Sequence, residues 1–160
     1  MMTRRRFLTL LGTGTVVAGA AAGGYLALPA EEAAAGDPRI RYGAEPCTQC
    51  GMIISDERFA AAWRAGRDER HFDDIGCMIA NFRKHHPAGD VAYFVRDFGG
   101  ATWLNAAAAT FVSAPGLKSP MGYDIAAFAT REAAQQVMAN RSGTNQETWA
   151  ALIDGLKERG

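Results

Sequence analysis

The chain has 160 residues, which is enough for one ordinary domain preceded by a short leader. Hydrophobic residues make up 48% and charged residues 21%, a globular mixture that excludes disorder along the whole chain. The formal net charge is zero, but Arg4, Arg5 and Arg6 stand at the front and the first acid is Glu31, so the remainder carries about −3. A mildly acidic domain without a basic stripe excludes a typical nucleic-acid-binding protein.

The first thirty residues combine a basic start with a weakly hydrophobic run. Thr3-Arg4-Arg5-Arg6-Phe7-Leu8 resembles the twin-arginine export signal, and the run 7–28 is rich in Gly, Ala and Thr. Small residues at 18–20 and 28–30 offer cleavage sites. We therefore predict that residues 1–30 are a twin-arginine-type signal peptide. The alternative is a retained anchor, because about 22 such residues can just span a bilayer.

Residues 31–38 are rich in alanine and predict a flexible tether, so the folded domain is expected over 39–160. The export signal implies that the twin-arginine export machinery is a partner and that the domain crosses the membrane already folded. We expect the mature protein in the periplasm or on the outer face of the cytoplasmic membrane. It would contact the membrane only through the leader, if the leader is not cleaved.

The first half of the domain alternates short strands with one helix. Short apolar and β-branched runs predict strands at 52–54, 59–63, about 70–72 and 91–98, with a hairpin turn at 66–68. Apolar residues spaced by three and four predict a helix over 75–85. Asp73 or Asp74 is expected to cap its first turn, and Pro87 to end it.

The second half repeats this theme. The pattern predicts strands at 103–104 and 110–112, a corner at 120–122, and helices over 126–141 and 149–156, with 130–132 as the start or a capped restart of the longer helix. Each half thus contains strands, a sulfur-bearing corner and a helix. We predict an α+β fold of duplicated ββα-type units, with antiparallel strands and helices packed on one side.

Sulfur-bearing residues gather at three corners of the predicted domain. Cys47 and Cys50 form a CxxC pair that runs directly into Met52, Cys77 precedes another methionine, and Met121 lies in a Pro-Met-Gly corner. Glycine flanks Met52 and Met121, where the backbone must turn and leave the sulfur accessible. Thiolate and thioether sulfur are soft donors that favour Cu(I).

Other roles for these residues stay open at this point. A lone CxxC in an exported protein is also typical of a disulfide or of half a zinc site. Met78 and Cys77 share a predicted helix and could both pack in the core. His71 ends a predicted strand and is a candidate imidazole ligand, whereas the His85-His86 pair at the helix end is expected to be solvated.

Four motifs stand in order along the chain: Cys47-Thr48-Gln49-Cys50-Gly51-Met52, Phe72-Asp73-Asp74-Ile75-Gly76-Cys77-Met78, Val95-Arg96-Asp97-Phe98, and Ser119-Pro120-Met121-Gly122 with Ala127-Phe128. Together these motifs resemble the NosL family, the accessory copper chaperones of nitrous-oxide reductase. The resemblance covers about residues 44–140.

The resemblance implies a protein without catalytic turnover that binds Cu(I) and delivers it to nitrous-oxide reductase outside the cytoplasmic membrane. It implies Cys50, Met52 and Met121 as first ligand candidates, converging at one accessible place. The next candidates are Cys47, Cys77, Met78 and His71. NosL proteins are typically lipoproteins with a lipid-bearing cysteine, but this chain has no cysteine before Cys47. Another acceptor cuproenzyme is therefore an alternative.

Two functions of other classes remain as alternatives. A periplasmic thiol–disulfide oxidoreductase would use Cys47 and Cys50, but redox pairs of that kind open a helix, and here β-branched Ile53 and Ile54 follow. A structural zinc module would need Cys77 and His71 to complete four ligands.

Overall fold

The computed structural model describes residues 36–100 and 102–155. The predicted signal peptide and residues 31–35 of the predicted tether lie outside these ranges. Within the described residues, no helix is both long enough and apolar enough to cross a membrane. Pro38 is buried, and the Gly36 carbonyl accepts a hydrogen bond from Arg64 at 3.1 Å, so the last residues of the predicted tether contact the domain.

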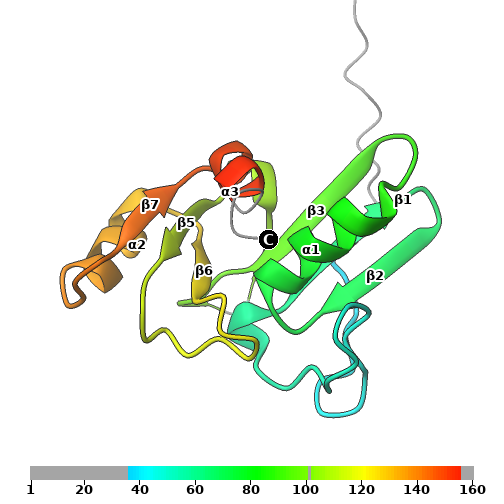
Figure 1. Ribbon diagram of the computed structural model, residues 1–160, viewed down its shortest axis with the longest axis horizontal. Helices are drawn as coiled ribbons and strands as arrows, with labels where there is room; N and C mark the ends of the chain where they lie inside the picture. Colours follow the sequence, from blue (N-terminus) through cyan, green and yellow to red (C-terminus); the bar gives the residue numbers. More distant parts are fainter. Residues whose placement is uncertain (1–35, 101, 156–160) are drawn as a thin grey trace, which may run out of the picture. The chain divides into compact units, whose positions relative to one another are not determined.

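The first half forms a four-stranded antiparallel sheet with one helix (Figure 1). Its strands, in the spatial order β2-β1-β3-β4, are β1 (Ala61–Ala65), β2 (Asp68–Phe72), β3 (Val91–Arg96) and β4 (Trp103–Asn105). Helix α1 (Ile75–His85) connects β2 to β3. A 3-10 turn (Glu57–Phe59) precedes β1, and another (Ala106–Ala108) follows β4.

The second half forms a three-stranded antiparallel sheet with two helices. Its strands, in the order β6-β5-β7, are β5 (Thr110–Ser113), β6 (Ile125–Phe128) and β7 (Asn145–Glu147). Helix α2 (Arg131–Met138) lies between β6 and β7, and α3 (Trp149–Gly155) follows β7. A parallel bridge between Asp97 and Ala127 joins the second sheet to the chain that leaves β3.

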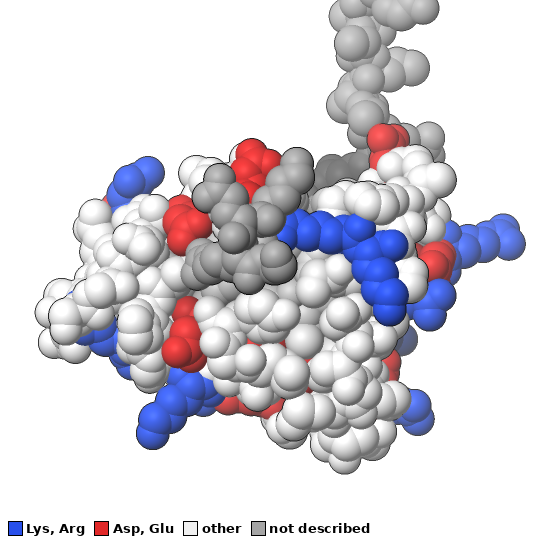
Figure 2. All heavy atoms as spheres, viewed as in Figure 1, with Lys and Arg blue, Asp and Glu red and all other residues white. Residues whose placement is uncertain are grey.

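Charged side chains are dispersed on the surface. On the face shown in Figure 2, some Lys and Arg side chains lie at the edge and others cross the right half of the face, with acidic residues at several places and much uncharged surface. On this face the basic residues form no stripe.

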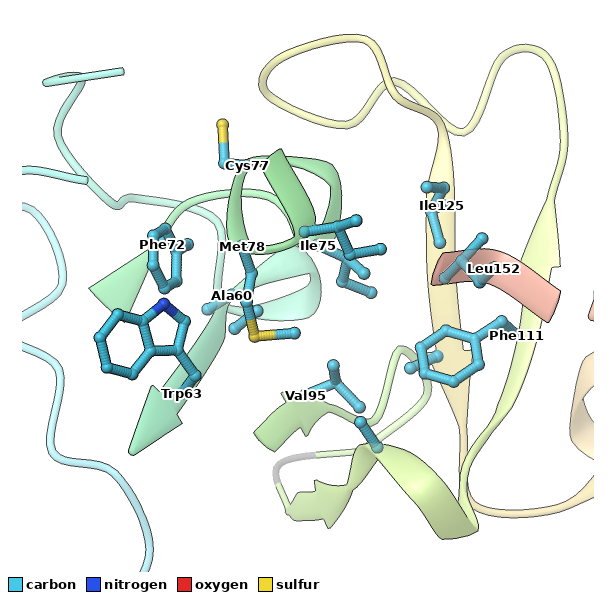
Figure 3. Close-up of a cluster of buried hydrophobic side chains, with 14 of the residues drawn as sticks. Ala60, Trp63, Phe72, Ile75, Cys77, Met78, Val95, Phe111, Ile125 and Leu152 are labelled. Carbon is cyan, nitrogen blue, oxygen red and sulfur yellow. The ribbon is translucent and has the colours of Figure 1, made fainter. Parts of the chain in front are cut away.

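The main core joins both halves. Phe72 and Val95 from the first sheet and Met78 from α1 pack in one cluster with Phe111 and Ile125 of the second sheet (Figure 3). On the other side of β5, Val112 packs in a smaller cluster with Ala134 of α2. Strands buried on both faces read as continuous apolar runs, which is the pattern of β6, Ile-Ala-Ala-Phe.

Several sequence predictions are confirmed and some are wrong. The helix over 75–85 has the predicted bounds, with Asp74 as its N-cap. The strand predicted at 52–54 is wrong, because this segment forms no ladder and makes only an isolated bridge between Pro46 and Ile53; Met52 and Ile53 are exposed, and only Ile54 is buried. The helix predicted over 126–141 is also wrong at its start. A buried alanine-rich strand, β6, takes the first residues, and the helix begins after Thr130, the capped restart.

The predicted α+β class with antiparallel strands is confirmed. In each half the first strand lies between the second and the third, and a helix follows the second strand: β2-β1-β3 around α1, and β6-β5-β7 around α2. The ββα unit is therefore followed by a third strand in both halves. The duplication itself stays a prediction. β7 was missed because Asn145–Glu147 is polar and lies at a sheet edge.

Candidate metal centre

Three thiols and a carboxylate converge between the CxxC loop and the start of α1. One ligand atom from each of Cys47, Cys50, Asp73 and Cys77 lies within 4.8 Å of the others. The side chains of Cys47 and Cys77 are only 2% and 1% exposed, whereas Cys50 is partly exposed. The cluster is therefore closed toward the core and reaches the surface at Cys50.

The CxxC loop is a tight turn held by backbone hydrogen bonds. The Cys47 amide donates to the Met52 carbonyl at 2.7 Å, and the Gly51 amide donates to the Cys47 carbonyl at 2.9 Å. Gly51 has φ +79°, a left-handed conformation that glycine adopts without strain. The Thr48 amide donates to the His71 carbonyl at 2.9 Å, which fixes the loop to the end of β2.

A chain of hydrogen-bonded polar side chains holds the same loop to α1. The Trp63 indole donates to the side-chain oxygen Oδ1 of Asn81 at 3.1 Å, and the side-chain nitrogen Nδ2 of Asn81 donates to the Gln49 side-chain oxygen at 3.1 Å. Asn81 is buried, and these two bonds give both the oxygen and the nitrogen of its side chain a partner. The residues between the two cysteines are thus positioned from the helix as well as from the strand.

Cys77 reaches the cluster because it lies in the first turn of α1. The Asp74 carboxylate caps the helix by accepting the Gly76 amide at 2.9 Å. Cys77 and Met78 are adjacent, but a helix turns by about 100° per residue. Figure 3 accordingly shows the Cys77 sulfur pointing away from the core that the Met78 side chain fills.

The three thiols differ in acidity. The Cys77 thiol donates a hydrogen bond to Cys47 and so lowers the pKa of Cys47 to about 6, against the effect of burial; backbone amides of Cys50 and Asp73 add to the lowering. Burial raises the pKa of Cys50 to about 11. The pKa of Cys77 is also raised, by its hydrogen bond to Cys47 and by burial. The first thiolate of the cluster is therefore Cys47.

Sequence reasoning missed Asp73 as a member of this site. Its carboxylate oxygens accept the Cys50 thiol at 3.5 and 3.6 Å, and its side chain is 1% exposed. From the sequence, either Asp73 or Asp74 is predicted to cap the first turn of the helix. Because only one residue can occupy the N-cap, the presence of a second acid beside it was the available signal.

Two exposed methionines lie in the corners that approach the cluster. Met52 is 51% and Met121 39% exposed. The Met121 amide donates to Asp74 at 3.1 Å, next in the chain to the aspartate that contacts Cys50. The Pro-Met-Gly and Cys-Gly-Met corners therefore approach the same strand–helix junction. The large hydrophobic side chains exposed among the described residues all come from these corners: Met52, Ile53, Met121 and Tyr123.

Met78 and His71 lie outside the cluster. Met78 is buried in the main core. His71 lies on the opposite side of β2 from buried Phe72, and its ring nitrogens contact Glu45 at 2.5 Å and Glu69 at 2.7 Å. Both ring nitrogens thus have carboxylate partners in this structure. Ligand roles for Met78 and His71 stay predictions from the sequence.

Comparison with known proteins decides the family. The NosL family model matches residues 42–150. The chain belongs to the NosL family. The crystal structure of the copper chaperone NosL from Shewanella denitrificans has a TM-score of 0.59 to this structure, with 16% sequence identity, and the match covers 70% of this chain and 92% of that one. At this identity, the likeness shows that the two NosL domains share a fold. No curated protein sequence matches this chain.

The contacts of His71 predict how stability depends on pH. Partial burial on its own raises the pKa of Glu45 and Glu69, but hydrogen bonds from His71 lower both below the ordinary value of 4.5, and Arg64 adds to this at Glu69. Stability from a carboxylate with a depressed pKa is present above the unfolded pKa and is lost as pH falls through the folded one. The free energy of unfolding of the wild type should therefore decrease as the pH is lowered below about 4.5.

In His71→Ala, the free energy of unfolding at pH 6 should be lower by about 1–3 kcal/mol, because two partly buried carboxylates lose a partner. Its further decrease between pH 4.5 and 3 should be smaller than in the wild type. Urea unfolding at several pH values measures both effects, with exposed His85→Ala as the matched control. Parallel pH profiles for wild type and His71→Ala would show that His71 does not lower the pKa of Glu45 and Glu69.

Proposed function

We propose that this NosL protein is a metallochaperone without catalytic turnover, which binds Cu(I) and passes it to a cuproenzyme. The observation that carries the proposal is the convergence of three cysteine thiols at a site that opens to the surface. Membership of the NosL family and the structural likeness to a protein described as a copper chaperone support it.

The donor chemistry favours Cu(I) as the cargo. Cys47 and Cys50 supply thiolates, while Cys77 keeps its proton and donates to Cys47. Met52 and Met121 supply thioethers, which stay neutral at any pH and are soft donors. The same pocket offers four donors to zinc if Cys77 and Asp73 both ligate, so metal analysis must distinguish the two ions.

The exposure gradient suits transfer of a metal ion. Cys47 is buried, Cys50 is partly exposed and Met121 is exposed, so an acceptor reaches the metal from the methionine side. Acceptor ligands can then replace the outer sulfurs before Cys47 releases the ion. The exposed apolar side chains of the Cys-Gly-Met and Pro-Met-Gly corners provide the surface that the acceptor protein would contact.

Nitrous-oxide reductase is the acceptor that we propose, on the strength of the motif resemblance. We further propose export through the twin-arginine route, to the periplasm or the outer face of the cytoplasmic membrane, from the arginine motif at 4–6. A thiol–disulfide oxidoreductase is less well supported. The CxxC pair lies in a loop, and α1 begins only at Ile75, so neither Cys47 nor Cys50 has the helix N-terminus of a redox pair.

Metal content tests the proposal. Protein purified from its export compartment should carry about one copper ion per chain and little zinc. Cys50→Ser should weaken Cu(I) binding by at least ~100-fold in competition with a chelator, since even outer-shell substitutions commonly cost ~10–100-fold. The Met52→Ala, Met121→Ala double variant should weaken it less, and the buried-core control Met78→Leu should match the wild type. Stoichiometric zinc without copper, or Cys50→Ser binding like the wild type, would overturn the proposal.

The unequal acidities of the thiols predict the pH dependence of binding. Above pH 7, Cys47 is already a thiolate and Cys50 still carries its proton, so each Cu(I) bound releases about one proton and log Kd should fall about one unit per pH unit. Below about pH 6, Cys47 must also lose a proton, and the slope should approach about two. Chelator competition from pH 5 to 9 measures it. A Kd independent of pH is the contrary result.

A further inference from the structure

The loop that carries Met121 is attached to the first turn of α1 by a buried carboxylate. One oxygen of Asp74 accepts the Gly76 amide at 2.9 Å, and the other accepts the Met121 amide at 3.1 Å. The Ser119 hydroxyl donates to the same carboxylate. Asp74 thus joins the start of a helix in the first half of the domain to a loop in the second half.

Asp74 does more than a helix cap requires. A capping side chain needs only one oxygen, whereas Asp74 uses both and is 0% exposed. None of the ion pairs formed by the described residues includes it. Burying a carboxylate costs free energy unless hydrogen bonds satisfy it. The Asp74 carboxylate keeps the hydrogen bonds from Met121 and Ser119 only while the loop that carries Met121 lies against α1.

Tyr123 makes a second attachment between the same two elements. A Cβ atom added to Gly76 would lie 2.0 Å from Cγ of the Tyr123 ring, so the ring rests directly on the Gly76 backbone, one residue before Cys77. Gly76 has no positive φ that would call for glycine. The close approach of the ring therefore accounts for glycine at this position.

The loop is braced internally, so these attachments place it as a unit. The Asp124 carboxylate accepts the amides of Gly116 at 3.1 Å and Ser119 at 3.2 Å, and the Asp124 amide donates to the Ser119 hydroxyl at 2.8 Å. The Gly122 amide closes the turn onto the Ser119 carbonyl at 3.0 Å. The position of Met121 relative to the cysteines is therefore set where the loop meets α1.

We propose that Asp74 and Tyr123 are positioning residues that hold the Met121 thioether at the mouth of the cysteine cluster, where it completes the Cu(I) site. This inference rests on the proposed copper-binding function and adds a requirement to it. Cysteine binding alone does not need the loop, whereas coordination by Met121 does. The two aspartates at this junction then have different roles. Asp73 accepts a hydrogen bond from the Cys50 thiol, and Asp74 holds the loop that carries Met121.

Methyl NMR of protein labelled with 13C-methyl methionine measures whether the Met121 methyl group responds to bound Cu(I). In the wild type, the Met121 methyl resonance should shift when Cu(I) is added. In Asp74→Ala that shift should be lost, and Cu(I) affinity should fall about tenfold, as it should in Met121→Leu. Combining Asp74→Ala with Met121→Leu should cause little further loss, because both changes remove one interaction.

Gly76→Ala is a second variant that leaves the Asp74 carboxylate intact. The new methyl group should displace Tyr123 and abolish the Met121 shift, although alanine favours a helix over glycine by about 1 kcal/mol. Thr130→Ala is the matched control: it removes the N-cap side chain of α2, costs about 1 kcal/mol of stability, and should leave the Met121 shift unchanged.

A wild-type Met121 resonance that does not respond to Cu(I) would overturn the inference, as would a full response in Asp74→Ala or Gly76→Ala. The copper-binding proposal fails separately. It falls if Cys50→Ser binds Cu(I) like the wild type, and it survives if Cys50→Ser loses Cu(I) while the loop variants do not.

Discussion

The junction between β2 and α1 carries the main constraint in this domain. Two consecutive aspartates are buried there, and each must find hydrogen-bond donors because water cannot reach them. Asp73 turns to the Cys50 thiol, and Asp74 caps α1 and accepts the Met121 amide. Satisfying these carboxylates requires the CxxC loop, the helix and the methionine loop to meet. The hydrogen bonds that Asp73 and Asp74 need when buried therefore bring the parts of the candidate site together.

The site also shares the hydrophobic core of the domain. Cys47 and Cys77 belong to the cluster that includes Phe111 and Leu152 of the second half, so packing between the halves holds two thiols in place. Of the three thiols, only Cys50 is partly exposed, and the proposed thioether donors Met52 and Met121 lie on the solvent side. A rigid inner part and an accessible outer part allow a chaperone to keep its metal until an acceptor offers new ligands.

Local signals in the sequence predicted the elements that depend on local physics. Apolar spacing and the acidic cap gave α1, and the sulfur motifs gave the family. Contacts between distant segments decided the rest. The strand Ile125–Phe128 looks helical until both its faces are seen to be buried. The roles of Asp73 and His71 depend on which side of the β2–α1 connection each side chain takes, and the spacing of the motifs does not encode that.

X-ray absorption at the copper edge of Cu(I)-loaded full-length protein determines whether sulfur binds the metal, because it distinguishes the donor types around the ion. We expect a low-coordinate shell of sulfur, which loses a sulfur scatterer in Met121→Leu. A shell dominated by nitrogen or oxygen, as binding through His71 or Asp73 would give, would contradict the sulfur site described here.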